Sequence, residues 1–283
     1  MRKQFTVFAL VLSFVLILSA CGKRDNNVQG AASSPAASSS ASASASASGQ
    51  TLLDSIKASG KIRIGTEGTY APFTFHDKDG KLTGFDVELA QEVAKRLGVQ
   101  PEFIETKWDG MFAGLDAKRF DMVANEVSIR DDRKEKYDFS SPYIVSKAVL
   151  IVHQDNNDIK QLSDLKGKKA GQSLTSNLTD IAKSNGAKIV QTDGFNQAIE
   201  LLLSKRIDAT INDGLSFLDF KKQKPDAPIK VVAETADASQ SAFLFNKGNQ
   251  ELVDAVNKAL DEMKSDGTYL QISEKYFGAD VSK

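Results

Sequence analysis

The sequence is poor in the side chains that most often carry metals, crosslinks or catalysis. Its 283 residues include one cysteine, Cys21, and two histidines, His76 and His153. A single cysteine cannot form an intramolecular disulfide, and the histidines do not stand at a metal-ligand spacing. A G-x-S-x-G motif and a P-loop are also missing from the sequence. We therefore expect no metal site, no cofactor and no catalytic residue.

Long apolar runs are scarce as well. The stretch Phe5–Leu18 is too short to cross a bilayer comfortably, but behind a basic pair it suits a secretory signal. It ends in Leu-Ser-Ala before Cys21, which resembles the lipobox of bacterial lipoproteins. We expect residues 1–20 to be a lipoprotein signal peptide and Cys21 to carry fatty acyl chains such as palmitate. An incidental cysteine after an ordinary signal is the alternative.

The next segment offers little that a core could bury. Residues 28–50 are nearly all Ala and Ser, which cannot offset the entropy of ordering. Residues 21–50 are therefore predicted to be the lipidated cysteine and a tether, and a flexible chain of about 30 residues reaches roughly 30 Å. We expect the protein to be anchored in the cell membrane on its extracytoplasmic side, near a membrane partner.

Net charge and length indicate what kind of protein the remainder of the chain forms. Without residues 1–20, 34 basic residues (36 minus 2) stand against 37 acidic ones, a formal charge of −3. This balance gives no indication of nucleic-acid binding. The roughly 230 residues after position 50 exceed the usual size of one compact domain, so two lobes are predicted.

Strands and helices alternate along this part, which predicts an α/β fold with a largely parallel sheet. An echo between residues 115–121 (LDAKRFD) and 202–208 (LLSKRID) predicts two lobes of similar design, although one such turn can match by chance. The part from Phe243 onward is expected to return to the first lobe. The predicted strands are 62–65, 101–106, 120–125, 145–152, 169–171, 188–191, 208–212 and 229–233. The predicted helices start at Phe85, Asp109, Leu178 and Glu251.

The segments that flank the predicted strands offer a planar cation, acids and aromatic side chains, which together suit a small ligand that carries a carboxylate, an ammonium and a side chain. Arg133 is the candidate for the carboxylate. Residues 125–133 follow a buried strand and are expected on the loop beyond its carboxyl end, where α/β sheets bind ligands. Ser128 would add a donor. Alternatively, Arg133 belongs to the solvated charge run Arg130–Lys136.

Candidates in the second lobe also follow a strand or precede a helix. Asp213 comes after an apolar strand and could pair with the ammonium, or it forms an ordinary turn with Gly214. The segment Ser173–Asn177 precedes a helix, where hydroxyls act as N-caps and exposed amides can bind a carboxylate.

Two aromatic and two acidic residues complete the candidate site. Tyr70 and Trp108 lie in loops and could sandwich a ligand, with core packing as the alternative. Glu67 and Glu126 fall on the same candidate loops and would suit a second positive charge. Their alternative is solvent exposure.

The chain from about Leu52 to Phe277 resembles the polar amino-acid-binding proteins of ABC importers, the bacterial extracellular solute-binding proteins of family 3. The order and spacing of the matching segments carry the resemblance. These segments are Gly65–Phe73, Leu82–Glu88, Trp108–Gly110, Asp131–Lys134 and Phe139–Tyr143.

The resemblance implies a two-lobed periplasmic-binding-protein-like fold of type II, with a ligand cleft between the lobes and two hinge strands near Val145–Val149 and Val231–Ala236. Lobe 1 would comprise residues 51–145 plus 236–283, and lobe 2 residues 146–235. The resemblance also implies that Tyr70, Trp108, Ser128, Arg133, Ser176 and Asp213 line the cleft and that Glu67 contacts the ligand's side chain.

Within the family, Gln172–Asn177 and Ala124–Asn125 look most like the cystine-binding branch, which adds Asn125 and Thr175 to the expected ligand-binding residues. L-Cystine carries a second ammonium, which suits the extra acids. Glu126 stands where that branch commonly has glutamine, so a basic amino acid, arginine or lysine, stays open as the ligand.

The expected partners are a small polar amino acid, a membrane ABC permease with its ATPase, and the membrane through the lipid anchor; we expect a monomer and no nucleic acid. One alternative is a cyclohexadienyl-dehydratase-like enzyme on the same fold, with Glu67 or Glu126 as acid or base. The pair Arg133 and Asp213 suits an intact zwitterion and argues against catalysis. A receptor or adhesin without an importer is a third possibility.

Overall fold

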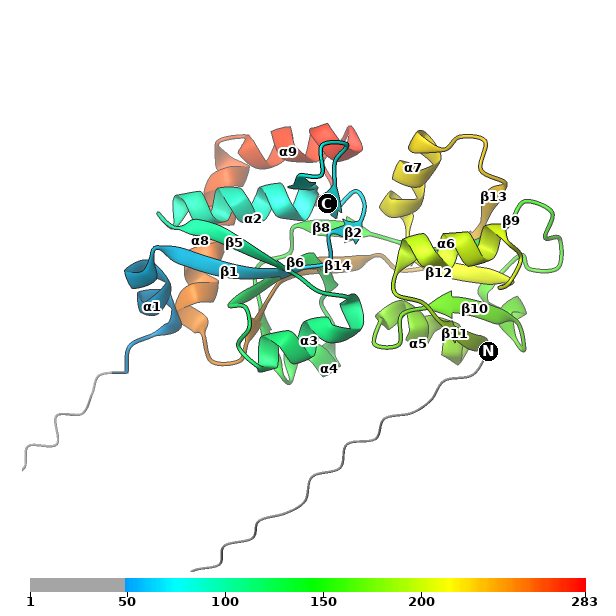
Figure 1. Cartoon of the computed structure of the whole chain (residues 1–283), viewed down its shortest axis with the longest axis horizontal. Helices are drawn as coiled ribbons and strands as arrows, with labels where there is room; N and C mark the ends of the chain where they lie inside the picture. The colour runs from blue at the N-terminus through cyan, green and yellow to red at the C-terminus, as the bar shows by residue number, and fades with distance from the viewer. Residues whose placement is uncertain (1–48) are drawn as a thin grey trace, which may run out of the picture. The chain divides into compact units, whose positions relative to one another are not determined.

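Two large β-sheets and one small sheet make up the described part of the chain, residues 49–283 of a computed structural model (Figure 1). The predicted signal peptide, Cys21 and nearly all of the tether lie outside the described residues. Between residues 49 and 283, every helix falls short of the length or the apolar character that a membrane span requires.

The first large sheet has the strand order β5-β1-β6-β14-β7, with β8 paired to β14. Its strands β1, β5 and β6 are parallel, whereas β14 runs antiparallel to β6. Apolar residues of α1, α2, α8 and α9 form one core on this sheet, and α3 packs on its other face (Figure 1). We call this part the first lobe.

The strands of the first lobe are β1 Lys61–Thr66, β5 Gln100–Glu105, β6 Met122–Ser128, β7 Tyr137–Phe139, β8 Ile144–Ser146 and β14 Ser239–Asn246. Its helices are α1 Leu52–Ser59, α2 Phe85–Arg96, α3 Trp108–Asp116, α4 Asp131–Lys134, α8 Gln250–Ser265 and α9 Thr268–Phe277.

The second large sheet has the strand order β11-β10-β12-β9-β13, and we call the part built on it the second lobe. Its strands are β9 Ala148–His153, β10 Lys169–Gln172, β11 Lys188–Gln191, β12 Ala209–Asp213 and β13 Ile229–Glu234. Its helices are a 3₁₀ turn at Leu162–Leu165, α5 Asn177–Ser184, α6 Phe195–Leu203 and α7 Gly214–Gln223. The small sheet of the first lobe consists of β2 Thr69–Tyr70, β3 Thr74–His76 and β4 Leu82–Thr83.

The two lobes repeat one design, which confirms the echo in the sequence. The order β5-β1-β6 in the first lobe matches β11-β10-β12 in the second. In both, the turn before the third strand places a lysine, Lys118 or Lys205, at a φ of 56°. The backbone N–H of Lys118 donates to Leu115 O at 2.9 Å, and that of Lys205 donates to Leu202 O at 3.0 Å. These bonds satisfy carbonyls that the preceding helix leaves open.

The chain crosses between the sheets twice. It leaves β8 after Ser146 and enters β9 at Ala148, and it returns between Glu234 and Ser239. Because β14 then pairs with β6 and α8 and α9 pack on the same sheet, the C-terminal part belongs to the first lobe.

Several residues that were predicted in loops belong to regular elements: Tyr70 ends β2 and Trp108 begins α3. Glu126 and Ser128 were expected beyond the end of the predicted strand 120–125, but β6 continues through Ser128. The polar residues stay in the sheet because β14 pairs with them: Ser241 lies opposite Ser128. The register shifts beside Glu126, whose φ is 50°. A β-bulge of this kind re-aims a side chain without ending the strand.

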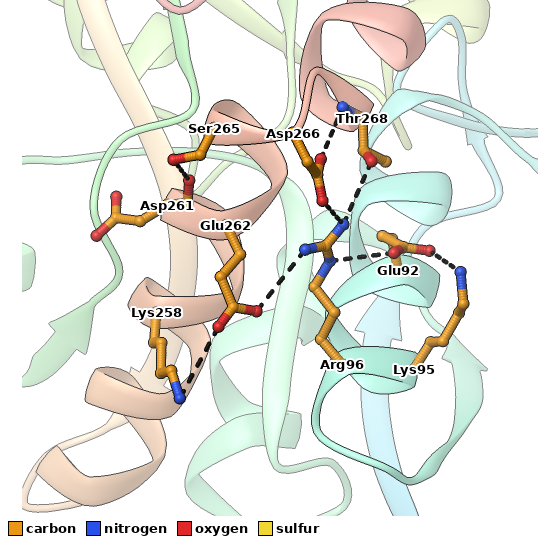
Figure 2. Close-up of polar contacts among 9 residues, drawn as sticks. All are labelled: Glu92, Lys95, Arg96, Lys258, Asp261, Glu262, Ser265, Asp266 and Thr268. Atoms are coloured by element: carbon orange, nitrogen blue, oxygen red, sulfur yellow. Dashed lines mark hydrogen bonds and ion pairs between the residues drawn. The ribbon is translucent and has the colours of Figure 1, made fainter.

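Arg96, near the end of α2, fixes the two C-terminal helices to the first lobe (Figure 2). Its Nη2 lies 2.7 Å from Asp266 Oδ2 in the corner between α8 and α9, and its Nη1 lies 3.7 Å from Glu262 Oε2. On its own helix, Nε lies 3.0 Å from Glu92 Oε1. One guanidinium thus connects three carboxylates from two segments that are far apart in the sequence.

Candidate functional site

A pocket lies between the two lobes and takes its walls from both. It holds about 570 Å³ of empty space, including the part that opens to solvent. The first lobe and its crossing segment contribute Glu67, Tyr70, Trp108, Asn125, Glu126, Ser128 and Ser239. The second lobe contributes Ala148, Ser173, Ser176, Asn177, Leu178, Gly194, Phe195, Asn212 and Asp213.

Three carboxyl groups line this pocket, and none of its lining residues is Lys, Arg or His. Burial raises the pKa of Glu67 to about 7 and that of Asp213 to about 6. Burial, and next the charge of Asp213, raise the pKa of Glu126 well above its usual value. Glu67 and Glu126 are each only 9% exposed, so the alternative of plain solvent exposure is wrong for both. The pocket is built to receive positive charge.

Asn125 holds Glu67 in place. Its Oδ1 accepts the backbone N–H of Glu67 at 2.8 Å, and its Nδ2 donates to Glu67 Oε2 at 2.6 Å. This two-point contact joins the end of β1 to β6 and fixes the direction of the carboxyl group.

Tyr70 and Trp108 form aromatic walls of the pocket. The Tyr70 hydroxyl lies 3.2 Å from Glu126 Oε2 and 3.0 Å from Asn212 Oδ1, so it joins the two lobes. Trp108 is buried, and its Nε1 has no hydrogen-bond partner among residues 49–283. Trp108 also packs in a core cluster of the first lobe, so the core-packing alternative holds for it beside its place in the wall.

Arg133 is buried behind the pocket wall and does not line it. It is 6% exposed, so the alternative of a solvated charge is wrong. Its Nη1 donates to Ser128 O at 2.9 Å, and its guanidinium carbon lies 5.5 Å from the centre of the Trp108 ring. None of the ion pairs in the described chain includes Arg133. Burial lowers its pKa to about 10. A buried cation without a paired anion is costly, and a bound anion would relieve that cost.

The predicted segment before α5 has two different roles. Ser176 lines the pocket, and its hydroxyl also accepts the N–H of Leu178 at 3.2 Å, which confirms the N-cap alternative. Thr175 lies outside the pocket lining. Its N–H and hydroxyl donate to Asp109 Oδ1 at 3.0 and 2.9 Å. Of the ten predicted ligand-binding residues, only Thr175 and Arg133 are absent from the lining.

Asp213 caps a helix and also faces the pocket. Its Oδ1 accepts the N–H of Leu215 at 2.8 Å at the start of α7, and its Oδ2 accepts the Ser146 hydroxyl. It also lines the pocket. Sequence reasoning missed its neighbour Asn212, which the end of an apolar strand could have indicated. It also missed Gly194 and Phe195, for which the sequence gives no motif.

Several contacts hold the lobes together around the pocket. Lys107 Nζ lies 2.7 Å from Asp193 Oδ2, and Arg130 Nη1 lies 2.8 Å from Asp180 Oδ2. Farther along the same seam, the Ser216 hydroxyl donates to Ala71 O at 3.0 Å. In this arrangement the cleft is closed over the pocket.

Comparison with known proteins places this architecture in a family. The model of the bacterial extracellular solute-binding proteins, family 3, matches residues 62–279. The L-cystine-binding protein TcyA of Bacillus subtilis (strain 168) is 46% identical over 284 residues, which cover 100% of both chains. This chain therefore has a relative along its whole length.

Two solved structures show the same two-lobed fold, which confirms the predicted fold class. An ancestral arginine-binding protein bound to arginine has a TM-score of 0.73 and 42% identity, covering 77% of this chain and 98% of its own. The L-cystine solute receptor of Neisseria gonorrhoeae in the unliganded open conformation has a TM-score of 0.55 and 49% identity, covering 82% and 99%. The open receptor has the lower TM-score although its sequence identity is higher. This agrees with a closed arrangement of the lobes in the present chain. The chain belongs to the bacterial extracellular solute-binding proteins of family 3.

Proposed function

We propose that the chain captures a small polar amino acid, L-cystine in the first place, and delivers it to an ABC importer in the membrane. The family is one of extracellular binding proteins, and a relative that matches the whole chain at 46% identity is named for L-cystine binding. Delivery requires a permease and its ATPase as partners, and the predicted lipid on Cys21 would keep the monomeric protein beside them.

The charge arrangement of the pocket is the observation that carries this proposal. Glu67, Glu126 and Asp213 offer carboxyl groups to cationic parts of a ligand, while Arg133 is a buried cation without an ion pair in the described chain. We assign the ligand's carboxylate to Arg133 with Ser128, and its α-ammonium to Asp213. The remaining acids then suit a second cationic group.

Cystine and the basic amino acids both carry a second cationic group. Cystine is favoured because of the cystine-binding relative, whereas the solved structure with arginine keeps arginine or lysine as the second candidate. Catalysis is not proposed, because the family and the compared relatives are binding proteins. On this view Glu67 and Glu126 bind charge and do not act as an acid or a base.

The proposed mechanism is hinge closure. The ligand docks on the first lobe, the second lobe closes over it with Asp213 and Ser176, and the permease recognises the closed form. The affinity then depends on the population of the closed state as well as on direct contacts.

Isothermal titration calorimetry tests this function. The soluble chain, residues 21–283 with Cys21→Ser, is titrated with cystine, arginine, lysine, histidine and glutamine. We expect tight one-to-one binding of cystine that is lost in Arg133→Ala and retained in Arg119→Ala, which removes an equal charge from an exposed position. An absence of heat with every amino acid would refute the proposal, and turnover of a prephenate-like acid would favour the enzyme.

A further inference from the structure

The Tyr70 hydroxyl stands between two oxygen atoms that both need a donor. Glu126 Oε2 lies 3.2 Å away in the first lobe, and Asn212 Oδ1 lies 3.0 Å away in the second. A phenol carries one proton, so it can donate a full hydrogen bond to only one of them. The other oxygen must itself carry a hydrogen if the contact is to be attractive.

The orientation of Asn212 decides which oxygen that is. Its Oδ1 also accepts the backbone N–H of Asp213 at 2.8 Å. Turning the amide would point its NH₂ at that N–H, so the hydrogen-bond network assigns Oδ1 as the acceptor. Tyr70 therefore donates to Asn212. The hydrogen between Tyr70 and Glu126 then belongs to Glu126 Oε2.

The second oxygen of Glu126 agrees with a protonated carboxyl group. Its Oε1 accepts the Ser241 hydroxyl at 2.9 Å and so acts as the carbonyl oxygen. Its backbone N–H donates to Asp86 Oδ2, and the φ of 50° at the bulge fixes its direction into the pocket.

The charges that face Glu126 come from several elements. Asp213 of β12 and Asp86 of α2 oppose its ionisation, and Arg133 of α4 is the cation that interacts with it. The charge of Glu126 also acts on Tyr143, which precedes β8, and the Tyr70 hydroxyl contacts Glu126 directly. Glu67 adds a third acid to the same pocket. Burial, then the charges of Asp213 and Asp86, raise the pKa of Glu126 well above its usual value, in agreement with the hydrogen-bond network.

We propose that Glu126 is a specificity-determining residue that exchanges its proton for the second cationic group of the ligand. This inference rests on the proposed function. When a ligand with two cationic groups binds, the proton leaves Glu126 Oε2 for the solvent, and the ligand's cation donates a hydrogen bond to the carboxylate. A ligand with one ammonium, such as glutamine, leaves the proton in place.

Proton counting by calorimetry tests the exchange. The soluble chain, residues 21–283 with Cys21→Ser, is titrated with cystine, arginine and glutamine at about pH 8, where carboxyls with a pKa of about 6 or 7 are mostly ionised. Each titration is repeated in two buffers of different ionisation enthalpy, and the difference in heat gives the protons released. Glu126→Gln is the test variant, because its amide can donate to Tyr70 as the protonated acid does. Glu102→Gln, at an exposed position on β5, is the matched control.

We expect cystine or arginine to release about one proton more from the native chain than from Glu126→Gln, and glutamine to show no such difference. Arginine gives the decisive comparison, because its guanidinium stays protonated both free and bound, so its second cationic group adds no proton to the difference. The Glu102→Gln chain should behave like the native one. Binding with equal proton counts in native and Glu126→Gln chains would overturn the inference and leave the proposed function standing. An absence of binding by every amino acid would overturn both.

Infrared difference spectroscopy on the native chain covers the case in which Glu126→Gln does not fold. Addition of cystine or arginine at about pH 8 should remove the C=O stretch of a protonated carboxyl group, whereas glutamine should not. A spectrum in which that band is unchanged by a bound two-cation ligand would contradict the exchange.

Discussion

Asp109 and Thr175 join the two lobes at the edge of the pocket: one carboxylate oxygen of Asp109 accepts both the N–H and the hydroxyl of Thr175. The other oxygen accepts the N–H of Leu174 at 3.2 Å. All three bonds exist only when the lobes are closed, since Asp109 is in α3 and its donors precede α5.

Replacing Asp109 by Ala should therefore weaken ligand binding without touching the ligand. Hydrogen bonds to an exposed carboxylate of this kind contribute about 1–2 kcal/mol together, so we expect roughly a 5- to 30-fold loss of affinity. Calorimetry compares the affinity of Asp109→Ala with that of Asp131→Ala, which removes the same charge from an exposed position of the first lobe. The difference in affinity then measures the loss of the contact between the lobes. Equal affinities in the two variants would contradict this role of Asp109.

The stability of the ligand-free protein should fall as pH rises from about 4.5 to about 7. Burial raises the pKa of Glu67 from 4.5 to about 7, so the folded state holds this proton more tightly than the unfolded state does. The resulting stabilisation is complete below about pH 4.5 and is lost as pH rises through about 7, up to roughly 3 kcal/mol.

Glu67→Gln should flatten that dependence, because an amide does not titrate. Melting temperatures of the native chain, Glu67→Gln and Glu102→Gln are measured across this range in the absence of amino acids. A native-like slope in Glu67→Gln would show that Glu67 does not carry the effect.

Gly84→Ala should strongly destabilise the first lobe. Gly84 caps α2 at a φ of 127°, and an added Cβ would lie 2.2 Å from the carbonyl oxygen of Phe73. Gly80→Ala is the matched control, because its φ is 77° but nothing lies within 4 Å of the added carbon. Backbone strain alone should cost about 1 kcal/mol in Gly80→Ala, and the clash should bring Gly84→Ala to about 3 kcal/mol or more in urea unfolding. Similar losses in both variants would exclude the clash.

Arg96→Ala should loosen the C-terminal helices. The guanidinium contacts Glu92, Glu262 and Asp266, and the loss should lower the melting temperature by about 2–4 °C in low salt. Arg119→Ala, at an exposed position, should change it much less. The difference should shrink at high salt, where exposed ion pairs are screened. A difference that does not respond to salt would indicate lost packing.

The helices and strands of the fold were predicted well from the sequence, because in each lobe short apolar strands alternate with amphipathic helices. Strand 188–191 matches β11, and the apolar spacing from Phe85 to Gly98 matches α2 and its end. Polar residues in a buried strand were misassigned. Glu126 and Ser128 look like loop residues in the sequence, and only the pairing with β14, more than 100 residues later, keeps them in the sheet.

The candidate site was predictable where function and local chemistry use the same residue. Asp213 and Ser176 stand at helix N-caps that also line the pocket. Phe195 and Gly194 were not predictable, because the start of α6 carries no motif that distinguishes it from an ordinary helix start. The burial of Arg133 could not be predicted either, since its neighbours in the chain are charged and exposed.

The position of β14 sets an order for folding during export. Within the described residues, β7 and β8 pair only with β14, which lies between β6 and β7 and begins at Ser239. All five strands of the second lobe lie between residues 148 and 234. A chain that emerges N-terminus first can therefore complete its inserted lobe before the earlier one. Until β14 arrives, the edge of β6 stays unpaired, and we expect the first-lobe intermediate to be the species that needs protection from aggregation.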